Sequence, residues 1–250
     1  MLRVLTIAAS CVAVTTTLAG CSTAGSTTTA APAVALAQSP ETARAPFRAT
    51  GNEPSWRLDI AGNEMTLLTN FGQDRLVAST PTAQVSGGTT KYVARTKQGD
   101  MTATIVDQLC VDSMSGMPHP QSVTVVIGGK TLTGCGGEPV SLLQGAEWTV
   151  VEIGGVPLDA GSKVTLDFAP DGHVSGHASC NNFTGAYTLS GEGLTISKVA
   201  GTRMMCEAAL MEQERKFLDT LGGVQTFSIA ADGALLLKTV DGRTIKARRR

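Results

Sequence analysis

From residue 47 to the end of the chain, short runs of residues alternate between apolar and polar side chains or are rich in β-branched residues, and turn signals separate the runs. Successive side chains of an extended strand point to opposite faces, so such alternation is typical of half-buried β-strands. Asp-Gly pairs at 171–172, 232–233 and 241–242 mark tight turns. The pattern predicts antiparallel strands joined by hairpins. The runs are SWRLDI (55–60), EMTLLT (64–69), TKYVART (90–96), MTATIV (101–106), SVTVVI (122–127), EWTVVEI (147–153), KVTLDF (163–168), HVSGHAS (173–179), GAYTLS (185–190), GLTIS (193–197), QTFSIA (225–230), ALLLKT (234–239) and RTIKA (243–247).

One segment breaks this rhythm. Residues 207–223, EAALMEQERKFLDTLGG, place large apolar side chains on one helical face and end in glycine, as helices commonly do. The apolar residues are Leu210, Phe217, Leu218 and Leu221. Glu212 and Lys216 form an i,i+4 pair on the other face. The segment predicts one amphipathic helix.

Glu214 falls on the apolar stripe of this helix, four residues after Leu210 and three before Phe217. A carboxylate at such a position either meets a cation, such as Arg203, or lies at the wet edge of the stripe. We favour the wet edge.

The segment GGEPVSLL, residues 136–143, separates an all-β half from a half that contains the helix. About two hundred residues from 47 onward are enough for one large domain or two small ones. We expect a mostly β fold with one helix (α+β), built as two small antiparallel β domains at 47–138 and 142–247. The second is expected to be a bent sheet or partial barrel packed by the helix.

The first twenty residues indicate the compartment. Met1–Arg3 is a short basic start, and Val4–Val14 is an apolar run that is too short to span a bilayer. This pattern is typical of a secretory signal peptide, which we assign to residues 1–20. Leu18-Ala19-Gly20-Cys21 resembles the lipobox of bacterial lipoproteins, in which the cysteine is acylated after cleavage. The alternative is a chance cysteine in a plain signal peptide. We expect a protein of the bacterial cell envelope, lipid-anchored through Cys21 on the periplasmic side, and Ser22 favours the outer membrane over the inner.

Residues 21–46 are rich in small and hydroxylated residues and contain prolines, a composition that cannot bury enough apolar area to offset ordering. They read as a flexible linker after the lipidated cysteine. A coil of this length spans about 25 to 30 Å, so the folded part is expected close to the membrane.

The charge balance argues against nucleic acid as a partner, because the net charge is −1 and the pI is about 6.3. The only basic cluster is KARRR at residues 246–250. A solvated tail is the favoured reading of this cluster, and a phosphate or lipid contact is the alternative.

Four cysteines remain once Cys11 leaves with the signal peptide and Cys21 takes lipid. In an oxidising compartment an even count suggests disulfides. Three pairings are possible, and the domain boundary favours Cys110 with Cys135 and Cys180 with Cys206. Each would close a loop of about 25 residues, which is worth roughly 3 to 4 kcal/mol by the chain-entropy estimate.

The segment DGHVSGHASC, residues 171–180, brings two histidines close to Cys180 in sequence. If it is a strand, His173 and His177 share one face while Cys180 lies on the other, and the two histidines are about 13 Å apart. One zinc ion cannot bridge that gap, and a Cys-His catalytic pair fails for the same reason. We therefore favour a disulfide cysteine and predict no metal or cofactor site.

The chain lacks the common catalytic motifs: G-x-S-x-G, a P-loop, a dinucleotide fingerprint and H-E-x-x-H. We expect a protein that is not an enzyme and that acts by binding or as a structural component.

Residues 142–247 resemble a META domain of the HslJ type. The residues that carry the likeness are Trp148, the turn 168–172, Cys180-Asn181, Gly185–Tyr187, Thr202–Met204, Cys206 and Glu214. The family is associated with heat shock, antibiotic tolerance, virulence and secretion, and no catalytic residue or cofactor is attached to it. The resemblance implies a strongly bent antiparallel sheet with one helix packed against it. Ser179 stands where the family usually has glycine.

Residues 47–135 resemble an uncharacterised module of bacterial envelope lipoproteins, through GNEPSW (51–56), CVDSMSG (110–116) and LTGCGG (132–137). That family more often has an aromatic where Ser55 stands. The pattern is also similar, more distantly, to periplasmic inhibitors of C-type lysozyme, which are small disulfide-bridged β-barrels on lipid anchors.

These observations favour a non-enzymatic envelope lipoprotein that binds an unknown envelope protein or ligand or supports stress tolerance, and they leave its oligomeric state open. The candidate contact residues are Glu53, Trp56, Asp112, Ser113, Met114 and Ser115, the last four in the loop Asp112–Pro120. The competing reading, which we favour, places Trp56 in the core and makes the loop a plain hairpin end. A second hypothesis is an inhibitor of C-type lysozyme that inserts residues 113–116 into the enzyme's cleft. A third is an enzyme on envelope polymer with Glu53 and Asp112 as its carboxylates.

Overall fold

The computed structural model describes residues 45–250, which fold into two antiparallel sheets and one α-helix. The expected signal peptide, the lipidated Cys21 and the linker up to residue 44 lie outside the described residues. The mostly β architecture with a single helix is confirmed. Within residues 45–250, no helix is both long and apolar enough to cross a membrane.

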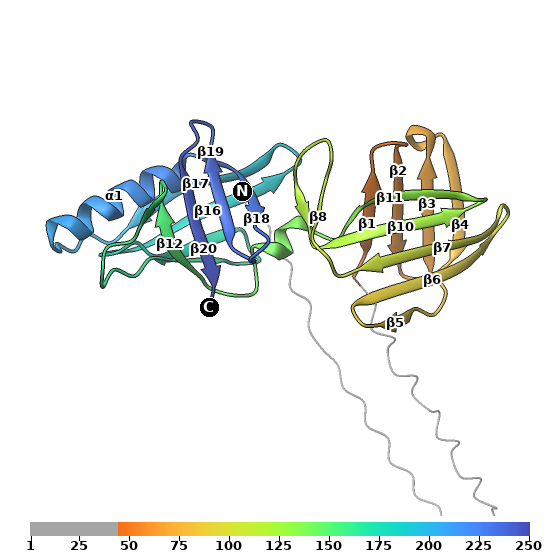
Figure 1. The fold of residues 1–250 in the computed structure, drawn as a ribbon, viewed down its shortest axis with the longest axis horizontal. Coiled ribbons are helices and arrows are strands. Elements are labelled where there is room, and N and C mark those ends of the chain that lie inside the picture. The colour runs from red at the N-terminus through yellow and green to blue at the C-terminus, as the bar shows by residue number, and fades with distance from the viewer. Residues whose placement is uncertain (1–44) are drawn as a thin grey trace, which may run out of the picture. The chain divides into compact units, whose positions relative to one another are not determined.

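The first sheet contains nine strands in the spatial order β4-β3-β2-β1-β11-β10-β7-β6-β5. Their bounds are β1 Phe47–Gly51, β2 Trp56–Ala61, β3 Glu64–Thr69, β4 Asp74–Ser79, β5 Gln84–Ser86, β6 Thr89–Thr96, β7 Gly99–Val106, β10 Gln121–Ile127 and β11 Lys130–Gly136, with a 3-10 turn η1 at Asn70–Gly72. In Figure 1, β1 to β4 run across the direction of β6, β7 and β10, and β4 lies near β6, so the sheet curls on itself.

Alternation explains why these residues form the first sheet. Along β2, Trp56, Leu58 and Ile60 are buried while the intervening side chains face solvent, and the same period recurs on β7 and β10. The inward side chains form a single hydrophobic cluster. Gly128 and Gly129 both have positive φ in the two-residue turn between β10 and β11, a conformation that glycine adopts without the steric cost of a Cβ.

A two-stranded ladder accompanies the first sheet, formed by β8 (Cys110–Val111) and β9 (Pro118–His119). Cys110 pairs with His119 in this ladder, and its sulfur forms a disulfide with Cys135 of β11. The loop between the two short strands is therefore fixed at its base.

The second sheet has the spatial order β17-β16-β15-β14-β12-β20-β19-β18, with β13 paired to β12. The elements of this half are η2 Pro139–Leu142 (a 3-10 turn), β12 Trp148–Ile153, β13 Val156–Pro157, β14 Thr165–Phe168, β15 His173–His177, β16 Asn182–Ser190, β17 Gly193–Gly201, α1 Ala208–Gly222, β18 Val224–Ile229, β19 Leu235–Thr239 and β20 Thr244–Arg249. The two ends of the sheet, β17 and β18, lie near each other. A Cβ at Gly193 would lie 2.2 Å from the carbonyl oxygen of Gln225, so glycine permits this close approach.

Helix α1 packs its apolar side against the second sheet, beside β17 (Figure 1). Phe217 and Leu221 are fully buried, and the ring of Phe217 meets that of Phe183 edge-on at 5.5 Å between centroids. The predicted i,i+4 pair is confirmed, with 3.7 Å between Lys216 Nζ and a Glu212 carboxylate oxygen. The bent sheet packed by one helix agrees with the expectation for this half.

The basic end of the chain is part of the second sheet rather than a free tail. Arg248 pairs with Asp232 at 2.6 Å and Arg250 with Glu147 at 3.4 Å. The Arg249 guanidinium lies 4.9 Å from the ring centroid of Trp148. The cluster is therefore not a free tail, because each of these arginines has a partner within the domain, but their side chains remain exposed to solvent as expected.

Candidate functional site

The loop between β8 and β9 is organised around the carboxylate of Asp112. One carboxylate oxygen accepts hydrogen bonds from the backbone amides of Met114 and Ser115, at 3.1 and 2.7 Å, and from the Ser115 hydroxyl at 2.7 Å. The other accepts a 2.8 Å bond from the side-chain amide of Asn52, which also donates to Ser113. Aspartate commonly closes turns in this way, by binding the backbone amides that follow it. The loop therefore has a defined conformation.

The same hydrogen bonds set the charge of Asp112. Its partial burial acts to raise the pKa, but the hydrogen bonds from Ser115, Asn52 and Met114 outweigh burial and lower the pKa to about 2. Asp112 is therefore ionised at neutral pH and is not suited to donate a proton as a general acid.

The tip of the loop presents an apolar side chain to solvent. Met114 is 81% exposed, and Ser113 and Ser115 beside it are exposed as well. Glu53 is exposed in the turn between β1 and β2, next to Asn52. Four of the expected contact residues thus lie on one loop, and Asn52 links that loop to the turn that carries Glu53.

Trp56 takes the core position, which was the favoured of its two readings, and so leaves the expected contact surface. It is only 3% exposed, lies in the core of the first sheet, and donates a 3.1 Å hydrogen bond from its indole nitrogen to the carbonyl of Thr133. The physical reason is its place at the start of β2, where the alternation directs it inward together with Leu58. Trp56 does not offer a surface to a partner.

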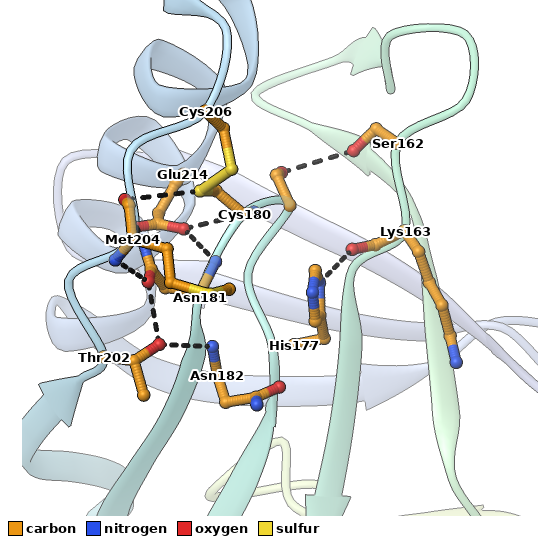
Figure 2. Close-up of a disulfide and its surroundings, with 11 residues drawn as sticks. Ser162, Lys163, His177, Cys180, Asn181, Asn182, Thr202, Met204, Cys206 and Glu214 are labelled. Carbon is orange, nitrogen blue, oxygen red and sulfur yellow. Dashed lines mark hydrogen bonds between the residues drawn. A yellow bond between two sulfur atoms is a disulfide. The ribbon is translucent and has the colours of Figure 1, made fainter.

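The histidine and cysteine segment of the second sheet forms no reactive pair. Cys180 is bonded to Cys206, with Cα atoms 6.0 Å apart, and His177 Nδ1 lies 2.9 Å from the carbonyl oxygen of Lys163 (Figure 2). His173 Nδ1 lies 3.2 Å from Asp171. The two disulfides, Cys110–Cys135 and Cys180–Cys206, are the pairing that the domain boundary favoured. Among residues 45–250, no three His, Cys, Asp or Glu side chains are grouped so as to hold a metal ion.

The alternation of faces ends earlier than expected in this segment. β15 stops at His177, and Ser179 has a φ of +79°. Ser179 is therefore turned inward instead of sharing the outer face with the histidines, and its hydroxyl lies 2.7 Å from the side-chain nitrogen of Gln213. A left-handed backbone is unfavourable for a residue with a Cβ.

Next to the disulfide, Asn181 ties three segments of the second sheet together (Figure 2). Its side-chain oxygen accepts hydrogen bonds from the Thr202 hydroxyl and the Met204 amide, both at 2.7 Å. Its side-chain nitrogen donates to Glu214 at 3.0 Å and to the Met204 carbonyl at 3.3 Å. Asn181 is 3% exposed, so its polar atoms are satisfied inside the protein, as buried polar groups require.

Glu214 has no ion pair with Arg203 and is half-buried, which agrees with the favoured reading at the wet edge of the apolar stripe. One of its oxygens accepts hydrogen bonds from the backbone amides of Asn181 and Cys180, at 2.7 and 3.2 Å, and the other accepts from the Asn181 side chain. It thus meets amide donors rather than Arg203. The carboxylate fixes α1 to the turn that contains the disulfide.

The family model described as META domain matches residues 141–250. This part of the chain is a META domain. Several of the signature residues that suggested it from sequence lie in two side-chain arrangements of the META domain. One is the Asn181 arrangement above. In the other, the Tyr187 ring meets Phe168 edge-on at 5.2 Å between centroids and its hydroxyl donates to the Ala169 carbonyl at 2.8 Å.

No protein with curated information matches the chain. Three solved structures are similar to parts of it. An NMR structure of a protein from Burkholderia xenovorans is 22% identical, covers 44% of this chain and 85% of its own, and has a TM-score of 0.37. A second NMR structure is 28% identical, with coverage of 44% and 92% and a TM-score of 0.37. A crystal structure of a DUF4847 family protein from Bacteroides vulgatus is 13% identical, with coverage of 44% and 96% and a TM-score of 0.35.

Two residues that organise these sites were missed by the sequence analysis. Asn52 holds the Asp112 loop from 60 positions away, and no local pattern marks it. Gln213 is buried on α1, accepts a 2.8 Å bond from the Asp159 amide and donates to Ser162 and Ser179. A signal for Gln213 was present, since it lies four positions before Phe217 and so on the apolar stripe of the META domain helix.

Proposed function

We propose that this chain is a non-enzymatic cell-envelope lipoprotein that binds a protein partner through the loop of residues 112–117, with the first sheet as the scaffold of that loop. The observation that carries the proposal is the contrast within the loop. Asp112 and Asn52 hold its backbone through hydrogen bonds, while Met114 at its tip is 81% exposed. An ordered loop loses little conformational entropy on binding, and an exposed methionine adapts to an apolar pocket.

The absence of catalysis is part of the proposal. A pair of carboxylates that cleaves a glycan requires one carboxylic acid with a raised pKa. The pKa of Asp112 is lowered to about 2 by hydrogen bonds from Ser115, Asn52 and Met114, against the effect of burial. Asp112 therefore does not meet this requirement for the general acid of such a pair.

Crosslinking tests the binding role. A photo-crosslinking residue is placed at position 114 of the full-length chain in living bacteria, and a matched one at Val85, which is 69% exposed on β5. We expect a discrete crosslinked protein from position 114 that is lost when Asp112→Ala is added, and none from position 85. The same product from both positions, or a product that survives Asp112→Ala, would contradict the proposal.

The lipid anchor is supported by the lipobox-like segment Leu18–Cys21 and the linker that follows it. We expect the native chain to incorporate labelled palmitate and to sediment with the outer membrane. Cys21→Ala should abolish labelling and release the protein from the membrane fraction. An unlabelled native chain cleaved at another position would count against the anchor, whatever the outcome at the loop.

A second candidate function is inhibition of C-type lysozyme. The observation that favours it is the same preformed loop, anchored by the Cys110–Cys135 disulfide, because an inhibitor that enters an acidic cleft needs a rigid projecting segment. Full-length protein in detergent is assayed against a C-type lysozyme. Inhibition that Met114→Ala and Asp112→Ala weaken would support it, and activity unchanged at micromolar protein would eliminate it.

A further inference from the structure

The first sheet encloses a cavity of about 930 Å³, which four hairpin turns border. Asn52–Ser55 between β1 and β2, Asn70–Gln73 between β3 and β4, Gln98 between β6 and β7, and Gly128 between β10 and β11 line it. This volume lies within the range of about 300 to 1,000 Å³ that small-molecule sites occupy. The cavity is formed by the first sheet alone and does not include residues 112–117.

The floor of the cavity is apolar. Leu67, Ile127 and Leu132 line it from β3, β10 and β11, and all three belong to the core of the first sheet. Leu76 of β4 adds a partly buried side chain. A ligand that enters the cavity therefore meets a fixed apolar surface on its inner side.

Phe71 stands at the edge of the cavity with its ring in solvent. It is 85% exposed, and its φ of +55° follows a φ of +51° at Asn70. Two successive non-glycine residues in the left-handed region carry a conformational cost. Burial of the ring does not offset that cost here, since the ring is exposed. Strained residues of this kind cluster at ligand-binding positions.

The rest of the rim is polar but nearly balanced in charge. Its amide and hydroxyl side chains belong to Asn52, Ser55, Thr69, Asn70, Gln73 and Gln98. Two cations, Arg75 and Lys130, stand against two carboxylates, Glu53 and Asp74, and Arg75 is also paired with Glu64 at 3.2 Å. Within residues 45–250, Lys130, Glu53 and Asp74 have no ion-pair or side-chain hydrogen-bond partner. A phosphate or another strongly anionic ligand would find no excess of positive charge here.

We propose that this cavity binds a neutral oligosaccharide, with one sugar ring stacked on Phe71. The hydroxyl groups of a sugar both donate and accept hydrogen bonds, which suits a rim of amides, hydroxyls and unpaired charges. The C–H face of a sugar ring carries partial positive charge and is attracted to the negative face of an aromatic ring. An aliphatic chain such as that of a fatty acid would remove water from the polar rim groups without offering them hydrogen bonds. Because unsatisfied polar groups cost free energy, such a ligand would bind the cavity more weakly.

Calorimetric titration of the full-length chain in detergent tests this proposal. The probes are a tetramer of β-1,4-linked N-acetylglucosamine, a tetramer of α-1,4-linked glucose, and lauric acid below its micellar concentration. We expect heat of binding from at least one tetramer. Phe71→Ala should weaken that binding roughly three- to tenfold, and Phe71→Trp should keep it within about twofold of the native chain.

Two controls separate this site from the loop and from misfolding. Val85→Ala and Met114→Ala each remove an exposed apolar side chain that is not part of the cavity lining, and both should leave oligosaccharide binding unchanged. Gln98→Ala, on the rim, should weaken it, and thermal unfolding shows that each variant is folded. Binding of neither tetramer, binding of lauric acid alone, or equal affinity in Phe71→Ala would overturn the proposal and leave the crosslinking result at position 114 unaffected.

Discussion

Asn181 and Glu214 form a closed arrangement in which the side-chain amide of one donates to the carboxylate of the other at 3.0 Å, and the backbone amide of Asn181 donates to the same carboxylate at 2.7 Å. The two residues are 33 positions apart and belong to different elements, the turn before β16 and helix α1. This pair connects the helix to the disulfide turn, and we expect the stability of the META domain to depend on it.

Replacing Asn181 tests that dependence. In Asn181→Ala, the Met204 amide and the Glu214 carboxylate lose buried partners, and we expect the free energy of unfolding to fall by about 2 to 3 kcal/mol. The neighbouring Asn182→Ala is the matched control, because its side chain is exposed, and it should change stability by less than about 0.5 kcal/mol. Urea denaturation measures both. Equal losses at the two positions would show that the hydrogen bonds of Asn181 do not stabilise the fold.

Much of the fold was predictable because it follows from short-range periodicity. The alternation of strands such as 101–106 and the helical stripe of 207–223 are local patterns, and both elements are present as β7 and α1. In the first sheet, β1, β4, β5 and β11 are missing from the predicted runs. The three-residue β5 is too short to show a period, and in β4 only Ala78 is buried. Such strands are defined by their pairing with neighbours, which a local pattern does not contain.

The candidate site was predictable in its residues but not in its geometry. The sequence placed Asp112–Ser115 in an exposed loop, yet the contact that orders the loop comes from Asn52, 60 positions away. Trp56 was named among the contact residues with a core position as its competing reading, and the pleat of β2 turns it into the core. The order of the loop thus depends on a long-range hydrogen bond, and the burial of Trp56 depends on where β2 begins. Neither is contained in a local sequence pattern.

At Ser179 we expect the usual order of stability to be reversed, so that a glycine variant is more stable than an alanine variant. In extended or helical segments alanine is the more stable choice, but at a φ of +79° a Cβ is strained by about 1 to 2 kcal/mol. Both Ser179→Ala and Ser179→Gly lose the hydrogen bond to Gln213. We expect the glycine variant to be more stable than the alanine variant by about 1 kcal/mol, as measured by urea denaturation. Lower stability of the glycine variant would show that the strain at this position is small.

The two disulfides are expected to stabilise the chain by closing similar loops. Their cysteines are 25 and 26 positions apart, so the chain-entropy estimate gives roughly 3 to 4 kcal/mol for each. Replacing Cys110 and Cys135 by serine should lower the midpoint of thermal unfolding, and proteases should then cut between residues 107 and 120, because the base of the loop is released. The comparison is the variant in which serine replaces Cys180 and Cys206. Cleavage between residues 107 and 120 in that variant would contradict a local effect of the Cys110–Cys135 disulfide.

Asp112 provides a prediction of pH dependence. Its pKa is lowered in the folded protein to about 2 by hydrogen bonds from Ser115, Asn52 and Met114, which outweigh burial, while an unfolded aspartate titrates near about 3.9. Because the folded pKa lies below the unfolded one, the stabilisation by Asp112 is fully present above about pH 4 and is lost as the pH falls toward 2.

Carbon-detected NMR of the Asp112 carboxyl group measures this pKa directly. We expect a titration midpoint near pH 2 in the native chain and a higher midpoint in Asn52→Ala, which removes the 2.8 Å donor. Asp232 is the matched carboxylate. Its pKa is lowered by the Ala234 amide first and then by Arg248, and because Asn52→Ala removes neither group, its midpoint should not change. A midpoint near pH 4 for Asp112 in the native chain would mean that the loop is not held by this carboxylate, and the ordered presentation of Met114 would lose its physical basis.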